Sequence, residues 1–202
     1  MRGMILSLIR HGLTPSNLGH RFNDHEHEPL DASGLSAFAG LAVDRAAYDR
    51  VDVSPLRRAV ETAERLGLTD YRLEPRITER GLGCFQGLTA AECRERYPDA
   101  FAAFERYEAE PAIPDGESRR AHLARVRDWL DDVRRSGAAN ALAVTHGGVI
   151  DFVYRLALDK PIHGGGTIFG GDNLSCSTFA LDSDRIKMIA FSAAIAPLTG
   201  AA

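Results

Sequence analysis

Apolar runs and amphipathic stretches alternate along the chain, and this pattern predicts strands that alternate with helices. Residues 4–9 are a continuous apolar run, which is typical of a strand covered on both faces. The short segment 49–54, with its β-branched residues, predicts a second strand that leads directly into a predicted helix over 55–66. Ser54 is expected to cap that helix and Gly67 to end it. The expected apolar face of the helix consists of Leu56, Val60, Ala63 and Leu66.

Two further segments continue the same alternation. Residues 139–158 have the pattern of a strand, a tight glycine turn and a helix. The segment before them predicts a long helix that begins after Ser118 and ends at Gly137. Because strands alternate with helices, we expect a three-layer αβα fold with a mostly parallel central sheet. The residues of the long helix that should face inward are Leu123, Val126, Trp129, Leu130 and Val133.

The segment 89–117 departs from this alternation. Thr89 and Glu92 have the spacing of a capping box, so a short helix should follow them and run into a loop. We therefore expect a single domain over 1–202, with 89–117 as a small helical, lid-like insertion over the active site. Residues 194–202 should form a loose tail.

The composition narrows the class of protein. The 202 residues are 45% hydrophobic, which is enough for a substantial core, and the formal net charge is -4. Without a basic surplus the chain is unsuited to neutralising a nucleic-acid backbone, and no apolar run approaches the roughly 20 residues that span a bilayer. Cys84, Cys93 and Cys176 indicate neither a disulfide framework nor a zinc site, and the first apolar run stops at Arg10, too early for a signal peptide. We therefore expect a cytoplasmic protein that binds neither nucleic acid nor membranes.

Three polar clusters follow predicted strands at the point where each strand ends. They are residues 10–12 (Arg-His-Gly), 54–58 (Ser-Pro-Leu-Arg-Arg) and 145–148 (Thr-His-Gly-Gly). Ligands of open α/β sheets bind beyond the carboxyl ends of the strands, so the arginines and histidines of these clusters should meet there. Arginine suits phosphate oxygens because it donates two parallel hydrogen bonds, and helix N-termini attract anions. The sequence therefore predicts a phosphate site at this edge of the sheet.

Several boxes of residues occur in an order that is known from one family. They are "RHG" at 10–12 followed by Asn17, "SPLRRAVETA" around Arg58, "ERGLGCFQGL" from Glu79, "PDGES" up to Ser118 and "VTHGG" around His146. A lone "RHG" arises by chance, whereas the ordered set is specific. In this set the chain resembles the histidine phosphatase superfamily, also called phosphoglycerate mutase-like, and in particular its phosphatase branch.

The resemblance implies a role for each matched residue. His11 would attack phosphorus and form a phosphohistidine that water then hydrolyses. Glu79 would protonate the departing oxygen and afterwards take a proton from water. Neither a metal nor another cofactor is implied, because arginines neutralise the phosphate. The residues expected to hold the phosphate are Arg10, Arg58 and His146, with Asn17 and Gly147 beside them.

Other titratable residues have competing interpretations. Residues 25–27 (His-Glu-His) are close enough along the chain to suggest a metal site. On a strand His25 and His27 could share a face, but no third ligand is evident beside them, so we expect no metal there. Arg21 is a candidate contact to the substrate's leaving group, as are His20 and His163. His122, on the predicted long helix, should be a packing or surface residue.

The charge of the predicted insertion bears on the substrate. Residues 90–114 carry six acidic residues and three arginines, which would repel a multiply charged substrate. We therefore expect a phosphatase that acts on a small phosphorylated metabolite with a neutral or modestly charged leaving group. Two alternatives stay open at this point: phosphoglycerate mutase-type phosphoryl transfer, and a non-catalytic phosphate-binding or scaffolding protein.

Overall fold

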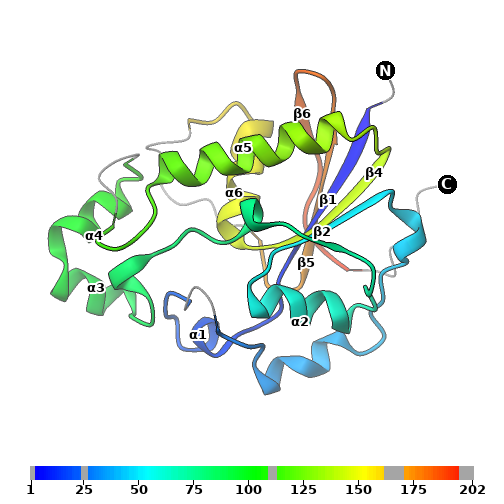
Figure 1. Ribbon diagram of the computed structural model, residues 1–202. Coiled ribbons are helices and arrows are strands. Elements are labelled where there is room, and N and C mark those ends of the chain that lie inside the picture. The colour runs from blue at the N-terminus through cyan, green and yellow to red at the C-terminus, as the bar shows by residue number, and fades with distance from the viewer. Residues whose placement is uncertain (1–2, 24–26, 109–112, 162–170, 196–202) are drawn as a thin grey trace.

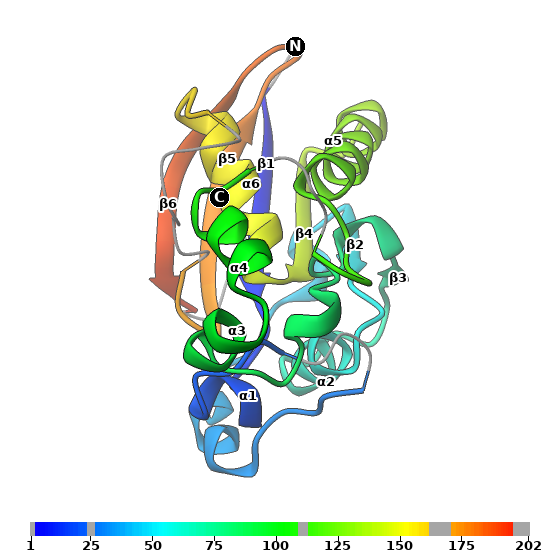
Figure 2. The same ribbon diagram turned by 90° about the vertical axis from the view of Figure 1, so that its left-hand side faces the viewer.

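A six-stranded sheet forms the centre of the computed structural model, which describes residues 3–23, 27–108, 113–161 and 171–195. The strand order is β3-β2-β4-β1-β5-β6, as Figure 2 shows from right to left. β1 pairs in parallel with β4, β4 with β2 and β2 with β3, whereas β5 is antiparallel to both β1 and β6. The sheet is thus mostly parallel, as predicted. The strands are β1 Met4–Arg10, β2 Arg50–Val53, β3 Arg72–Leu73, β4 Asn140–Thr145, β5 Ser175–Leu181 and β6 Ile186–Ala194.

Helices cover both faces of this sheet (Figure 1). Helices α5 and α6 bury one face together with Leu6 and Leu8 of β1, and α2 buries the other face together with Ile9. β1 is therefore apolar on both sides, and the predicted three-layer fold is confirmed. None of the helices in the described segments is long and apolar enough to cross a membrane. The α-helices are α1 Pro15–Leu18, α2 Arg57–Arg65, α3 Ala90–Arg96, α4 Pro98–Glu105, α5 Arg119–Arg135 and α6 Gly147–Ala157, and the 3-10 helices are Ala32–Phe38, Arg45–Ala47, Pro75–Ile77 and Gly83–Phe85.

Helix α5 follows its sequence pattern. The Ser118 hydroxyl accepts a hydrogen bond from the Ala121 backbone N–H at 3.1 Å, and the helix ends before Gly137, whose φ is +75°. His122 is buried as well and packs on the ring of Phe152, with the ring centroids 4.8 Å apart. Its interpretation as a packing residue is therefore confirmed. The inward-facing residues that become fully buried are Val126, Trp129, Leu130 and Val133.

The start of α2 differs from the prediction. The helix begins at Arg57, after Leu56, and its first turn receives no side-chain cap. The Ser54 hydroxyl instead lies 2.7 Å from a ring nitrogen of His146. The prediction that Ser54 caps the helix was wrong, because the strand β2 ends beside β4 and turns this hydroxyl toward a neighbour across the sheet.

The last two strands are not predicted by the hydrophobic pattern. β5 buries Ser175 and Ser177 together with Phe179 and Leu181, so polar residues interrupt the apolar pattern of a strand that is covered in the fold. Both hydroxyls are satisfied locally: Ser175 donates to the Asp172 carbonyl at 2.7 Å, and Ser177 accepts from the Ser192 N–H at 3.1 Å. The predicted tail over 194–202 was wrong at its start, since β6 includes residue 194 and residue 195 is buried. Residues 196–202 lie outside the described part of the chain.

Helices α3 and α4 form a small lobe that stands apart from the sheet, next to the start of α5 (Figure 1). The predicted capping box is present, because Thr89 and Glu92 each accept the other's backbone N–H, at 3.2 and 2.7 Å. Two helices follow it rather than one, since Pro98 cannot continue α3 and instead begins α4. The lobe has its own apolar cluster, which consists of Phe85, Cys93, Phe101 and Ile113.

Candidate active site

Strands β1 and β4 end side by side, and this register brings two histidines together. Arg10 is opposite Thr145 in the parallel pairing, and the His11 N–H donates to the Thr145 carbonyl at 3.0 Å. The next residue of each strand is a histidine, and the imidazole centroids of His11 and His146 are 5.1 Å apart. Both histidines are buried: 3% of the surface of His11 is exposed, and 0% of the surface of His146. The predicted convergence of the two strand ends is therefore present.

A third strand end completes this edge. Val53 of β2 pairs with Val144 of β4, so Ser54 lies one strand away from His146. The Ser54 hydroxyl and the Nε2 atom of His146 are 2.7 Å apart, which is hydrogen-bond distance. This contact fixes the plane of the His146 ring within the site.

His11 is held as a neutral imidazole of one tautomer. Its Nδ1 atom lies 2.7 Å from the Gly12 carbonyl oxygen, and because a carbonyl only accepts, Nδ1 carries the hydrogen. The Nε2 atom therefore keeps its lone pair. Burial lowers the pKa of His11 well below its usual value of 6.5, and the positive charges of Arg58 and Arg10 lower this pKa further. A neutral imidazole with a free Nε2 lone pair is the form that can attack phosphorus.

This tautomer can be tested by NMR. Spectra of protein labelled with ¹⁵N-histidine are expected to show His11 with a protonated Nδ1 and an unprotonated Nε2. Because its pKa is depressed, the ring should stay neutral as the pH falls through 6.5, the usual pKa of a histidine. Comparison with a His11→Asn variant assigns the signal. A His11 ring that takes up its proton at the usual pKa of 6.5 would contradict the interpretation.

Arg58 reaches the site from the first turn of α2. Its residue is 1% exposed, and its carbonyl accepts a hydrogen bond from the Thr62 hydroxyl at 2.6 Å. The same hydroxyl oxygen accepts the Gly12 N–H at 2.9 Å, so α2 is bonded directly to the residue that follows His11. The helix and the end of β1 are thus fixed relative to each other, with the Arg58 charge close enough to lower the His11 pKa.

Arg10 lies against the start of α6. A Cβ atom at Gly147 would be 3.6 Å from the Arg10 guanidinium, and the guanidinium donates to the Gly171 carbonyl. Burial lowers the pKa of Arg10, and the carboxylates of Glu79 and Asp172 offset part of this effect. Arginine stays charged after such a shift, so the half-buried Arg10 and the buried Arg58 form a cationic pair around His11.

Glu79 is held beside this pair by backbone hydrogen bonds. Its Oε2 atom accepts the Gly148 N–H at 3.0 Å, and its Oε1 atom accepts the Arg80 N–H at 2.9 Å. A Cβ atom at Gly148 would lie only 2.2 Å from Oε1, so only glycine leaves room for the carboxylate. Arg125 of α5 donates to the Glu79 carbonyl at 3.1 Å and to the Thr78 carbonyl at 2.8 Å. The carboxylate is thereby fixed at the first turn of α6, next to Arg10.

The structure brings together most of the residues that the sequence singles out. Six of them lie at this edge of the sheet: Arg10, His11, Arg58, Glu79, His146 and Gly147. Asn17 adjoins them through Asn173, which donates to the Asn17 Oδ1 at 3.1 Å and to the His11 carbonyl at 3.0 Å. The Asn17 side-chain nitrogen donates to Asn23 at 3.0 Å.

Arg21 is not part of this cluster. The side chain is exposed, and it donates to the Gly87 carbonyl at 2.9 Å and to Glu92 at 2.7 Å. In the structure Arg21 therefore connects the first loop to the start of α3, because the backbone of residue 21 pairs with that of residue 89. The expected contact of Arg21 to the leaving group stays a prediction.

Several residues of the site escape the sequence analysis. Thr62, Arg125 and Asn173 act on the predicted residues through the bonds described above. Ser54 belongs to the predicted cluster 54–58, but its bond to His146 is not foreseen. Thr62 and Arg125 have ordinary helical surroundings in the sequence, and Asn173 has no motif around it, so only spatial proximity identifies them. His122 is a further case, since a Cβ atom at Gly148 would be 3.1 Å from its ring and 3.2 Å from the Glu79 carboxyl carbon.

The histidines considered as metal ligands do not form a site in the described residues. Across residues 3–23, 27–108, 113–161 and 171–195, no group of three or more His, Cys, Asp or Glu side chains is arranged to hold a metal ion. His20 and His27 are exposed. The predictions for His25, Glu26 and His163 fall outside the described residues.

Sequence comparisons identify relatives over most of the chain. A profile of the histidine phosphatase superfamily (branch 1) matches residues 6–193. A glucosyl-3-phosphoglycerate phosphatase of Mycobacterium tuberculosis is 34% identical over 191 residues, covering 87% of this chain and 84% of that protein. A metal-independent phosphoserine phosphatase of Arabidopsis thaliana is 31% identical over 156 residues, covering 73% of this chain. The chain spans 66% of the length of this plant protein, and it spans 44% of a bifunctional M. tuberculosis protein that is 33% identical over 163 residues.

Solved structures share the fold. The mycobacterial glucosyl-3-phosphoglycerate phosphatase is 28% identical, with a TM-score of 0.74 over 96% of this chain and 100% of that chain. The α-ribazole phosphatase of Shigella flexneri is 24% identical, with a TM-score of 0.78 over 96% of this chain and 98% of that chain. At the latter identity the likeness concerns the fold alone.

Proposed function

Because the chain belongs to the histidine phosphatase superfamily (branch 1), we propose that it is a phosphomonoester hydrolase whose nucleophile is His11. The observation that carries the proposal is the state of His11: a buried imidazole, neutral, with its Nε2 lone pair free and two arginines beside it. These features match the needs of a nucleophile that must approach a phosphate dianion without itself being protonated.

In the first step the Nε2 atom of His11 attacks phosphorus, and the bond from phosphorus to the ester oxygen breaks. Arg10, Arg58 and His146 bind the three non-bridging oxygens and stabilise the charge of the transition state. Glu79, in its protonated form, gives its proton to the departing oxygen, so this oxygen departs as a hydroxyl group and not as an alkoxide. The products of this step are a phosphohistidine and the Glu79 carboxylate.

In the second step water replaces the alcohol. The Glu79 carboxylate takes a proton from the water as its oxygen bonds to phosphorus, and the bond from phosphorus to the His11 nitrogen breaks. Inorganic phosphate leaves, His11 is again neutral, and Glu79 is again protonated. The backbone N–H groups of Arg80 and Gly148 support this role, because each binds one carboxylate oxygen and so fixes the direction of proton transfer.

The substrate is proposed to be a small phosphorylated metabolite. Relatives named for phosphoserine and for glucosyl-3-phosphoglycerate support this class of substrate. The lobe of α3 and α4, within 89–117, is proposed as a lid over the leaving group, because its Tyr107 hydroxyl lies 3.3 Å from Asp151 of α6. The cytoplasmic location stays a prediction from the cysteine pattern.

Hydrolysis of p-nitrophenyl phosphate in the presence of EDTA tests the proposal. We expect the purified protein to release nitrophenol at the same rate with and without the chelator, because two arginines supply the positive charge that metal ions provide in other phosphatases. The control is a metal-dependent alkaline phosphatase, which EDTA inactivates. Loss of activity in EDTA with recovery on adding a divalent cation would contradict metal independence.

The same preparation distinguishes the alternatives. A non-catalytic phosphate-binding protein would bind inorganic phosphate and hydrolyse no monoester. A mutase would interconvert 3-phosphoglycerate and 2-phosphoglycerate faster than it releases phosphate, and ³¹P NMR follows both reactions at once. We expect phosphate release to dominate.

A further inference from the structure

A second pair of arginines, Arg80 and Arg119, lies beside Glu79. Arg80 follows Glu79 directly in the chain and is only 8% exposed. Arg119 is the first residue of α5. Both guanidinium groups lie over the ring of Phe104 in α4, with their Cζ atoms 5.2 and 5.5 Å from its centroid. One aromatic ring thus holds two like charges at the junction between the lobe and the sheet.

Neither arginine of this pair forms an ion pair with any residue that the structure describes. Arg119 stacks on Tyr107 instead, with its Cζ atom 3.3 Å from the ring centroid. Other arginines of the region are paired, which makes the contrast informative: Arg94 with Glu105, Arg106 with Glu108, and Arg21 with Glu92.

The carboxylates around the pair are already bound. Glu79 and Glu117 lie within electrostatic range of Arg80, and Asp151 lies within range of Arg119, where Arg155 adds a further positive charge. The bonds that occupy them are those from the Arg80 and Gly148 N–H groups to Glu79, from Arg125 to Glu117, and from Arg155 and Tyr107 to Asp151. The positive charge of the pair is therefore only partly compensated.

Burial and repulsion make this arrangement unfavourable without an anion. Burial, followed by the charge of Arg119, lowers the pKa of Arg80 to about 10, and burial also lowers the pKa of Arg119. Both groups remain protonated at neutral pH. An anion between them would offset the repulsion and accept hydrogen bonds from both guanidinium groups.

We propose that Arg80 and Arg119 bind an anionic group on the leaving-group side of the substrate, a carboxylate or a second phosphate. The inference rests on the proposed function, because Glu79 must then contact the leaving oxygen, and Arg80 is the next residue in the chain and within electrostatic range of the Glu79 carboxylate. Phe104 and Tyr107 hold the two guanidinium groups in place, so little freedom is lost when they bind. The substrates of this enzyme are then phosphate monoesters of acidic alcohols.

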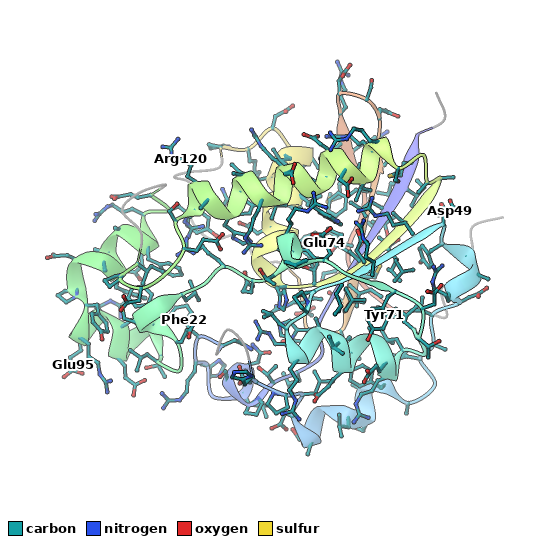
Figure 3. The ribbon with its side chains drawn as sticks, viewed as in Figure 1. Phe22, Asp49, Tyr71, Glu74, Glu95 and Arg120 are labelled. Atoms are coloured by element: carbon teal, nitrogen blue, oxygen red, sulfur yellow. The ribbon has the colours of Figure 1, made fainter. Side chains whose placement is uncertain are left out.

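This assignment narrows the expectation of a neutral or modestly charged leaving group to a leaving group that carries an anion. That expectation depends on the acidic residues of 90–114, but Glu92, Glu105 and Glu108 are ion-paired in the structure. Glu95 lies at the outer end of the lobe (Figure 3). The acidic residues of this segment that the structure describes are therefore ion-paired or exposed, and the charge next to Glu79 is positive.

Two matched pairs of substrates test the inference. O-phosphoserine and O-phosphoethanolamine differ by one carboxylate, and fructose 1,6-bisphosphate and fructose 6-phosphate differ by one phosphate. We expect the wild-type protein to have a higher kcat/KM for the anionic member of one pair, which identifies the source of the anion. Arg119→Met and Arg80→Met should each reduce that preference by about 30-fold, the scale of a charge-assisted hydrogen bond.

Controls separate recognition from folding. Both variants should keep p-nitrophenyl phosphate hydrolysis within about threefold, since nitrophenol carries no anion at this position, and Arg127→Met, exposed on the same helix, should change neither activity nor preference. If Arg80→Met does not fold, the substrate preference of Arg119→Met alone tests the inference. Hydrolysis without a preference, or a preference that survives in the variants, would overturn this inference alone. No hydrolysis of any monoester would overturn the proposed function and the inference with it.

Discussion

Replacement of His11 by alanine is expected to lower kcat/KM for p-nitrophenyl phosphate by about 10⁴-fold or more. The variant keeps Arg10, Arg58 and His146, so it should still bind phosphate, but it has no atom that can form a bond to phosphorus. Thermal unfolding should remain cooperative, because the site is held by the register of β1 with β4 and by the Gly12 bond to Thr62.

The covalent intermediate gives this prediction a direct readout. Wild-type protein mixed with ³²P-labelled substrate and quenched in base should retain label that acid removes, as a phosphoramidate does. His11→Ala should retain none. A labelled alanine variant, or a variant with full turnover, would show that the nucleophile is elsewhere.

Replacement of Glu79 by glutamine is expected to slow hydrolysis by an amount that depends on the leaving group. For an alkyl phosphate the loss in kcat should be about 10³-fold, because the alkoxide then departs without a proton. For p-nitrophenyl phosphate it should be about tenfold, since nitrophenolate is stable as an anion. Steady-state kinetics with both substrates measures the two losses, and an equal loss for both would rule out Glu79 as the acid.

Two further variants support this test. Glu95→Gln makes the same chemical change on the exposed outer end of the lobe, and we expect it to leave both rates unchanged (Figure 3). Gly148→Ala would place a Cβ atom 2.2 Å from the Glu79 Oε1 and so displace the carboxylate. This variant should reproduce the leaving-group dependence of Glu79→Gln while the Glu79 side chain is still present.

The fold could be predicted where the residue pattern is unambiguous. The continuous apolar run of β1 and the amphipathic α5, with Ser118 before it and Gly137 after it, correspond to elements of the structure. β5 was not predicted, because its buried apolar residues Phe179 and Leu181 are preceded by the buried serines Ser175 and Ser177, whose hydroxyl groups find partners only in the folded chain. The local pattern of hydrophobic residues indicates which apolar side chains are buried. It does not indicate which buried polar groups find hydrogen-bond partners in the tertiary structure.

The same distinction applies to the candidate site. The boxes around His11, Arg58, Glu79 and His146 supply its chemical groups and support the family, which the comparisons confirm. Arg21 shows the limit of such matching, since its neighbourhood in the sequence suggests a substrate contact, whereas the pairing of residues 21 and 89 turns it toward Glu92.

The sequence by itself determined which reactive groups this protein has and that they follow strand ends, because chemistry and strand pattern are properties of local residues. Only the tertiary structure decided how these groups behave. Burial and the approach of Arg58 from α2 make His11 neutral, and the ring of Phe104 brings Arg80 and Arg119 together. The physical reason is that desolvation and charge interactions depend on distances in space. These distances are determined by residues that lie far apart in the chain.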